Sequence, residues 1–202
     1  MAIERTDAQV HLEAGREGRL MSDNIVDAME EHAFGLLSFI ADTESEHTQD
    51  TPRRFAKMLY ELTQPEPFKF TTFESASDEM VIVKRIPFYT FCAHHVLPFH
   101  GYASIGYIPQ GRICGISKLA RTVEWYCRDL NVQEELTISI ADRIEDELSP
   151  KGVAVVMTAE HLCMTMRGVE APGTQTITSA MIGAFADHTR QARAEFLSLI
   201  KD

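Results

Sequence analysis

The sequence lacks a long apolar segment: no run of about 18 apolar residues, the usual minimum for a membrane-spanning helix, occurs in its 202 residues. Its first residues, Met-Ala-Ile-Glu-Arg-Thr-Asp, also lack the basic-then-apolar order of a secretory signal. Cysteine is scarce, with 4 residues, whereas disulfide frameworks belong mainly to small secreted domains. We therefore expect a cytoplasmic protein with no membrane partner, in which the thiols stay reduced.

An excess of basic residues is absent as well. The chain has 19 Lys and Arg against 30 Asp and Glu, a formal net charge of −11. Nonspecific nucleic-acid binding depends on a basic field and on counterion release, so we expect no nucleic-acid partner. A negative net charge does not exclude a small anionic ligand, because the local arrangement of basic residues decides whether an anion binds. Internal repeats and low-complexity segments are also missing.

The N-terminal third predicts a flexible arm over residues 1–21 and a helical appendage over residues 22–66. The first predicted helix begins near Ser22, and its apolar stripe consists of Ile25, Met29, Leu36, Leu37 and Ile40. The second begins at Thr51-Pro52, with Phe55, Met58, Leu59 and Leu62 on its apolar stripe. Pro65 and Pro67 mark the boundary with the main domain, residues 67–202.

The main domain alternates strand-like and helical segments. Residues rich in β-branched and aromatic side chains predict strands over 80–86, 88–91, 102–108, 153–159, 162–169 and 174–182. Helical spacing predicts helices over 117–130, with Ser117 as N-cap, over 132–148, and from about 188 to 200. The fold class is therefore α+β. Cys114 and Cys127 lie in apolar surroundings, so we expect small buried residues there.

Two short clusters carry thiols and imidazoles. Cys92, His94 and His95 lie within four consecutive positions at a predicted strand end, and His161 and Cys163 form the second cluster. These are zinc ligands in type, so folding could complete a zinc site from the two halves.

Spacing narrows the ligand set. Adjacent residues in extended chain point to opposite sides, so at most one of His94 and His95 should ligate. Cys92 and His95, three apart, can both face inward across a turn, and we place His161 and Cys163 on one face of a strand. We favour Cys92, His95 and Cys163 as ligands, leaving one position for water. The alternative is a closed structural site with four ligands.

Basic residues recur in pairs three apart on predicted helices. Lys118 and Arg121 lie near a helix N-terminus, and phosphate binding there is favoured over a solvated face. Arg54 and Lys57 form the other pair, for which a solvated basic face is an equally good explanation.

Five separated motifs now closely resemble the GTP cyclohydrolase I family, in the same order and over roughly Ser22 to the C-terminus. They are residues 51–58, the Cys92 cluster, residues 115–121, Val132-Gln133-Glu134, and residues 161–168. The resemblance implies a zinc-dependent hydrolase that converts GTP and water to 7,8-dihydroneopterin triphosphate and formate. It further implies the tunnelling fold, an antiparallel sheet backed by helices. The family assembles into a ring, typically a homodecamer of two pentamers, with active sites between subunits.

The resemblance also implies roles for individual residues. It makes Cys92, His95 and Cys163 the Zn²⁺ ligands, and it gives proton transfer to His94 and His161. Glu134, with Gln133, would read the guanine edge, which adenine cannot match. Ser117 would lie near the ribose and phosphates, and the triphosphate would be held by Arg54, Lys57, Lys118, Arg121 and Arg167.

One position departs from the family pattern Cys-Glu-His-His, because Ala93 replaces the usual glutamate. Loss of that carboxylate predicts reduced or re-tuned turnover with zinc and GTP binding retained. A non-catalytic GTP-binding ring is therefore the alternative. A zinc nucleobase deaminase is disfavoured, because His-x-Glu paired with Pro-Cys-x-x-Cys is missing. The family's product feeds folate, biopterin and 7-deazaguanine routes, among which the sequence does not choose.

Overall fold

The computed structural model describes residues 23–186 and 191–201, so the predicted arm lies outside the described residues. The chain divides into two compact units, residues 1–65 and residues 66–202. Within the described ranges, no helix combines the length and the apolar character needed to cross a membrane.

The first unit pairs helix α2 (Asp23–Leu37) with helix α3 (Thr51–Leu62). Val26, Ala56 and Tyr60 form its small buried core. Arg53 joins the two helices from the outside, because its Nη1 lies 2.8 Å from Asp27 Oδ1 and 2.7 Å from Glu30 Oε2.

The apolar stripes predicted for these helices are wrong in part. Ile25 and Leu36 are 41% and 61% exposed, Ile40 lies beyond the end of α2 at 78% exposed, and Met58 of α3 is 41% exposed. The buried residues of the two helices include Val26, Ala33, Ala56 and Tyr60 instead. Alanine lets two helix backbones approach closely, so a prediction that weighs only large apolar side chains misplaces the contact face.

The second unit is built on a five-stranded sheet in the order β5-β2-β3-β6-β7, all neighbours antiparallel except the β5-β2 pair. Its strands are β2 (Val81–Cys92), β3 (Pro98–Ile108), β5 (Leu130–Asn131), β6 (Gly152–His161) and β7 (Thr176–Gly183). Two short strands, β1 (Thr72–Glu74) and β4 (Arg112–Cys114), pair separately. The α+β class is therefore confirmed.

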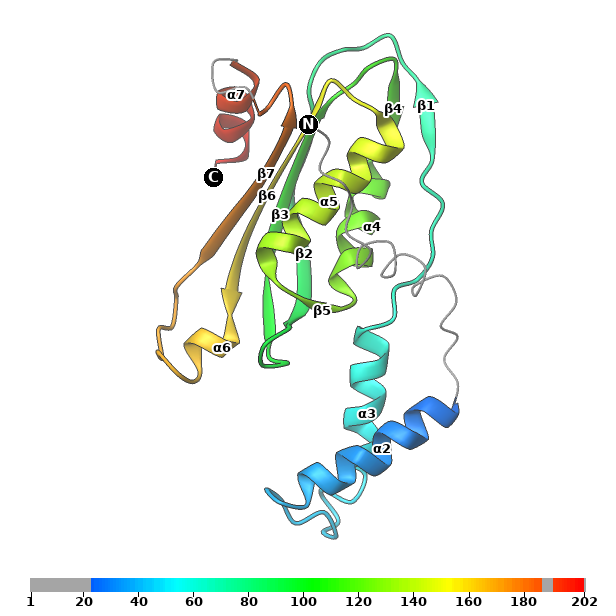
Figure 1. Ribbon diagram of the computed structural model, residues 1–202, viewed down its shortest axis with the longest axis vertical. Helices are drawn as coiled ribbons and strands as arrows, with labels where there is room; N and C mark the ends of the chain where they lie inside the picture. Colours follow the sequence, from blue (N-terminus) through cyan, green and yellow to red (C-terminus); the bar gives the residue numbers. More distant parts are fainter. Residues whose placement is uncertain (1–22, 187–190, 202) are drawn as a thin grey trace. The chain divides into compact units, whose positions relative to one another are not determined.

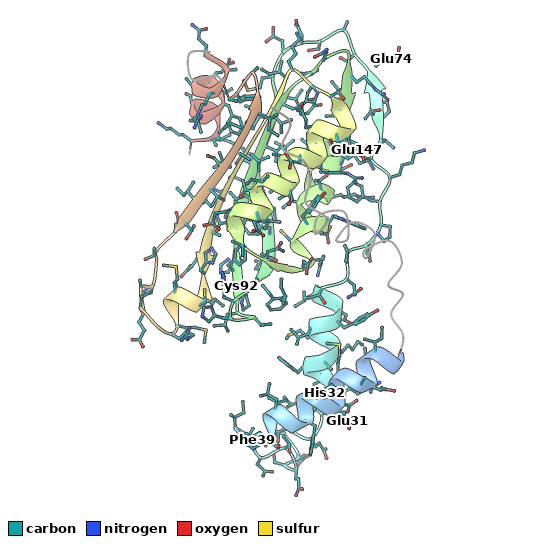
Figure 2. The ribbon with its side chains drawn as sticks, viewed as in Figure 1. Glu31, His32, Phe39, Glu74, Cys92 and Glu147 are labelled. Carbon is teal, nitrogen blue, oxygen red and sulfur yellow. The ribbon has the colours of Figure 1, made fainter. Side chains whose placement is uncertain are left out.

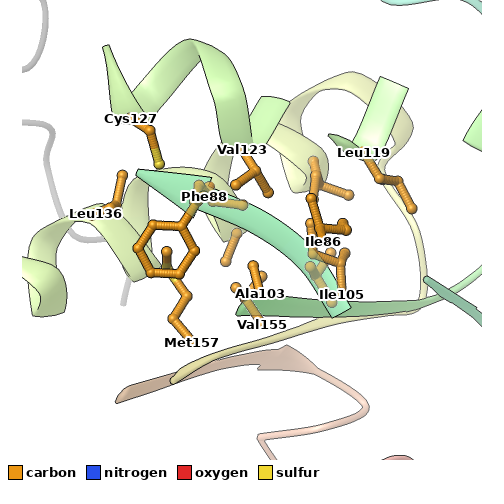
Figure 3. Packing of buried hydrophobic residues seen from close by; sticks show 14 of the residues in the cluster. Ile86, Phe88, Ala103, Ile105, Leu119, Val123, Cys127, Leu136, Val155 and Met157 are labelled. Carbon is orange, nitrogen blue, oxygen red and sulfur yellow. The ribbon is translucent and has the colours of Figure 1, made fainter. Parts of the chain in front are cut away.

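Helices α4 (Ile116–Cys127) and α5 (Gln133–Leu148) cover one face of the sheet (Figure 1). Alternate strand residues such as Ile105 and Val155 point into this interface and meet Leu119 and Val123 of α4 (Figure 3). Cys114 and Cys127 are buried as predicted, and burial raises the pKa of Cys127 to about 12.

Helix α7 (Gln191–Ile200) packs on the opposite face. Phe196 is fully buried there with Phe185, their ring centroids 5.7 Å apart. Gly106 of β3 makes room for this contact, because a Cβ atom at that position would lie 2.7 Å from the Phe196 ring. The predicted C-terminal helix is thus present over its described part.

Candidate metal centre and its surroundings

Cys92 is the last residue of β2 and begins the tight connection to β3 (Figure 2). Its N–H donates to Leu97 O at 2.8 Å, and its carbonyl accepts from the N–H groups of Val96 at 2.9 Å and His95 at 3.3 Å. Val96 closes the turn with a φ of 53°, a costly conformation for a β-branched residue. This turn carries His95 back toward Cys92, so that Cys92 Sγ and His95 Nδ1 lie 3.9 Å apart.

Cys163 reaches the same place from another part of the chain. A strand was expected over residues 162–169, but β6 ends at His161 and a short helix, α6 (Leu162–Thr165), follows. The prediction that His161 and Cys163 share a strand face is therefore wrong. The neighbouring strands explain the difference: the β3 pairing stops at His161 and the β7 pairing at Ala159, so later residues have no ladder to extend.

The three predicted ligands converge. The ligand atoms of Cys92, His95 and Cys163 all lie within 4.8 Å of one another. A tetrahedral zinc site, with bonds of about 2.3 Å to sulfur and about 2.0 Å to nitrogen, needs roughly 3.6 Å between sulfur and nitrogen. The donor types and the 3.9 Å separation of Cys92 Sγ from His95 Nδ1 fit such a site. His94 is also close, with Nδ1 3.7 Å from Cys92 Sγ, although it is not a member of the converging set.

The surroundings of Cys163 favour its neutral thiol over its thiolate. Burial, and after it the neighbouring Cys92 thiol, raises the pKa of Cys163, while Arg167 lowers it. A bound dication would reverse this preference and stabilise the thiolates.

His161 lies beside the cluster in a defined orientation. Its ring stacks on Phe99 with centroids 4.4 Å apart and an interplanar angle of 6°. Its Nε2 lies 2.6 Å from Gln133 Oε1. Burial lowers the pKa of His161, and Glu134 opposes that effect.

Gln133 and Glu134 begin α5 but face different surroundings. Gln133 is 2% exposed, and its amide makes its hydrogen bonds inside the protein, whereas Glu134 is exposed. Sequence reasoning paired the two as guanine readers and missed the bond between Gln133 and His161. A buried glutamine cannot be told from an exposed one by its position in a motif.

The predicted phosphate-binding cations lie on several different elements of the chain. Arg167 follows α6 and acts electrostatically on Cys163. Lys118 lies near the start of α4, which Gly115 caps in place of the predicted Ser117. At about 1.5 Å per residue, Lys118 is about 14 Å along the axis from Cys127, the end of α4 that leads to β5 and Cys92. Figure 1 shows α4 running along the sheet in this direction.

The structure therefore brings some predicted site residues together within this unit but leaves others apart. The cluster at the sheet end contains Cys92, His94, His95, Gln133, Glu134, His161, Cys163 and Arg167. Ser117, Lys118 and Arg121 occupy the first two turns of α4. Arg54 and Lys57 belong to the other unit, where they pair with Asp50 at 3.0 Å and Glu61 at 3.7 Å.

The mixed α+β fold thus brings two thiols and an imidazole, a donor set that could hold a metal ion, close to a half-buried histidine. Comparison with known proteins names the family. The profile described as GTP cyclohydrolase I matches residues 29–201, so the chain belongs to the GTP cyclohydrolase I family, and its mixed fold is consistent with the tunnelling fold of that family.

Individual relatives agree. GTP cyclohydrolase 1 of Dehalococcoides mccartyi is 50% identical over 173 residues, which span 82% of this chain and 91% of the relative. GTP cyclohydrolase 1 of Hydrogenobaculum sp. is 50% identical over 162 residues, 79% of this chain and 88% of the relative. A crystal structure of the archaeosine synthase QueF-Like in the apo form aligns at 20% identity and a TM-score of 0.43, over 53% of this chain and 96% of that one. So weak a likeness supports no conclusion about function.

Proposed function

We propose that this protein converts GTP and water to 7,8-dihydroneopterin triphosphate and formate. One observation carries the proposal: in a chain of this family, Cys92, His95 and Cys163 converge within 4.8 Å, beside a histidine held by a fixed hydrogen bond. The thiols are free in the structure, and a reducing cytoplasm would keep them so.

Zn²⁺ is the metal that this donor set fits best, because two thiolates and one imidazole are ligands of the types that Zn²⁺ prefers. Cys92, His95 and Cys163 would hold it. When bound, zinc with one open position supplies Lewis-acid activation of water near neutral pH.

The chain's own residues supply binding and proton transfer. Glu134 is an exposed carboxylate that can accept two hydrogen bonds from adjacent N–H groups of guanine. Burial lowers the pKa of His161 and so favours its neutral imidazole, which can accept a proton, and His94 is a second imidazole at the cluster. His161 and His94 are thus the two proposed proton carriers for the hydrolysis at the purine C8.

A second copy of the chain completes the triphosphate site in this proposal. Lys118 and Arg121 start at the far end of α4 from Cys92, whereas Arg167 lies near Cys163, so one unit does not gather these cations. Association into a ring, with the decamer of the family as the expected form, would place Ser117, Lys118 and Arg121 of one subunit against the cluster of the next. Arg54 and Lys57 are further candidates for the phosphates.

The test follows formate release and pterin fluorescence from GTP, with and without a zinc chelator. We expect turnover that the chelator abolishes and added Zn²⁺ restores. Release of ammonia in place of formate, or turnover indifferent to the chelator, would contradict the proposal. Mass measurement in solution tests the ring, and a fully active monomer would refute the shared site.

The alternative is a non-catalytic GTP-binding ring, which Ala93 favours. Ala93 is exposed, and its N–H donates to Asn131 O at 3.0 Å, so a glutamate side chain there would extend outward from the turn without disturbing that bond. Ala93→Glu should therefore fold normally and alter the rate and its pH profile. An unchanged rate and profile would show that the missing carboxylate is irrelevant, and an inactive parent that binds GTP would establish the alternative. Which pterin or 7-deazaguanine route uses the product depends on enzymes that act later.

A further inference from the structure

We infer that Gln133 is a positioning residue: its amide oxygen fixes the neutral tautomer of His161, with the hydrogen on Nε2, and so leaves Nδ1 as the ring nitrogen that can accept a hydrogen bond. This inference rests on the proposed function, since it assigns the role of His161 at atomic level. It also replaces the expectation that the Gln133 side chain reads guanine.

The orientation of the Gln133 amide follows from its neighbours. Its Nε2 lies 3.3 Å from Met157 O and 3.1 Å from Thr176 O. Both partners are backbone carbonyls, which only accept hydrogen bonds, so the NH₂ group must face them. The opposite amide atom, Oε1, therefore faces His161 at 2.6 Å. Because Oε1 can only accept, the ring nitrogen must donate.

Two threonine hydroxyls support the same assignment. Thr137 Oγ1 donates to Gln133 O at 2.7 Å, which uses its proton. At the 2.6 Å contact between Thr137 Oγ1 and Thr178 Oγ1, Thr178 must then donate. Thr178 Oγ1 is left as an acceptor for Gln133 Nε2, 3.1 Å away. All three neighbours of Gln133 Nε2 are thus acceptors, which its two N–H groups share, and none of them could donate to an amide oxygen placed there.

The His161 imidazole has little freedom to rotate out of this hydrogen bond. His161 pairs with Phe99 across the β3-β6 ladder and stacks flat on its ring. A ring flip would direct a carbon atom at Gln133 Oε1 and leave that buried acceptor unsatisfied. Nδ1 is therefore the ring nitrogen without a hydrogen, while the Nε2 hydrogen stays with Gln133.

The assignment predicts that Gln133 affects rate and not affinity. Gln133→Met keeps the length of the side chain and removes the acceptor. Metal sites lose about 10- to 100-fold when a comparable outer partner is lost, and we expect a fall of that size in kcat with KM for GTP within twofold. Glu135→Met, a substitution in the same helical turn at an exposed position, is the matched control and should change neither constant.

A double-mutant cycle separates the two roles. In a His161→Ala background, Gln133→Met should cause no further loss of rate, and GTP binding at equilibrium should not change. A guanine reader would behave differently, since Gln133→Met would then weaken GTP binding in both backgrounds with kcat preserved. That outcome would overturn the inference.

A spectroscopic test is independent of turnover. Nitrogen NMR of the full-length, ¹⁵N-histidine-labelled protein, with His161→Ala to assign the signal, should show the Nε2–H tautomer in the parent and a mixture in Gln133→Met. A parent with the proton on Nδ1 would refute the inference, even if Gln133→Met failed to fold. If the parent released no formate from GTP, the proposed function would be refuted. The NMR measurement would still decide which nitrogen of His161 carries the hydrogen, because it does not depend on turnover.

Discussion

Glu134→Gln tests how the protein selects its base. Glu134 is exposed in the first turn of α5, directly after the buried Gln133, whose fixed side chain holds the start of the helix in place. A carboxylate there can accept both the ring N–H and the exocyclic N–H of guanine. Glutamine retains one acceptor and turns a donor toward the second N–H, so one charge-assisted hydrogen bond is lost.

The expected size of the effect follows from that bond. A hydrogen bond to a charged group contributes about 1.5–3 kcal/mol, so a loss of about 2 kcal/mol should lower kcat/KM for GTP roughly 30-fold. Inosine triphosphate lacks the exocyclic amino group and makes only one of the two bonds. The preference for GTP over inosine triphosphate should therefore shrink in Glu134→Gln.

Glu135→Gln is the matched control for this substitution. It lies in the same turn and removes the same charge from the helix N-terminus, an effect of about 0.3–1 kcal/mol on stability in either variant. Steady-state rates of each variant with GTP and with inosine triphosphate test whether Glu134 contacts the guanine edge. Equal losses in the two variants, or an unchanged ratio between nucleotides in Glu134→Gln, would refute the assignment of Glu134 to the guanine edge.

Three other outcomes follow from the structure. Cys163→Ala should lose bound zinc and turnover, whereas Cys127→Ala, a buried thiol outside the converging ligand set, should keep both, as measured by metal content and formate release. Retained zinc in Cys163→Ala would exclude that ligand. Phe196→Ala should lower the free energy of unfolding by about 3–5 kcal/mol in denaturant titration, because its ring is fully buried, whereas Leu199→Ala, at a position 52% exposed, should cost far less. Burial raises the pKa values of Cys127 and Tyr107 to about 12. The contribution of their protonated forms to the free energy of unfolding is therefore complete below about pH 9. It is lost as the pH rises toward 12, at up to about 1.4 kcal/mol per pH unit for each group. Alkaline unfolding should become less steep in Cys127→Ala, and an unaltered slope would contradict this origin.

Parts of the fold could be predicted because local pattern and tertiary contact agree. The spacing of Leu136, Ile140, Ile144 and Leu148 predicts α5, and all four are buried against the sheet. The segment after His161 shows the opposite case. Residues 162–169 have strand-like composition, but a strand needs neighbours, and the ladders on both sides have already ended.

The sequence by itself determined the family and the chemistry available, because Cys92, His95 and Cys163 are ligand types whose spacing, together with three other ordered motifs, is specific. Tertiary structure decided how those groups can act. It placed Cys163 on a helical turn, buried Gln133 against His161, and separated Lys118 from the cluster by most of a helix. The physical reason is that a motif encodes residue identity and local spacing, whereas burial, proton position and distance depend on partners from remote segments, such as Met157 and Thr176, that complete each hydrogen bond.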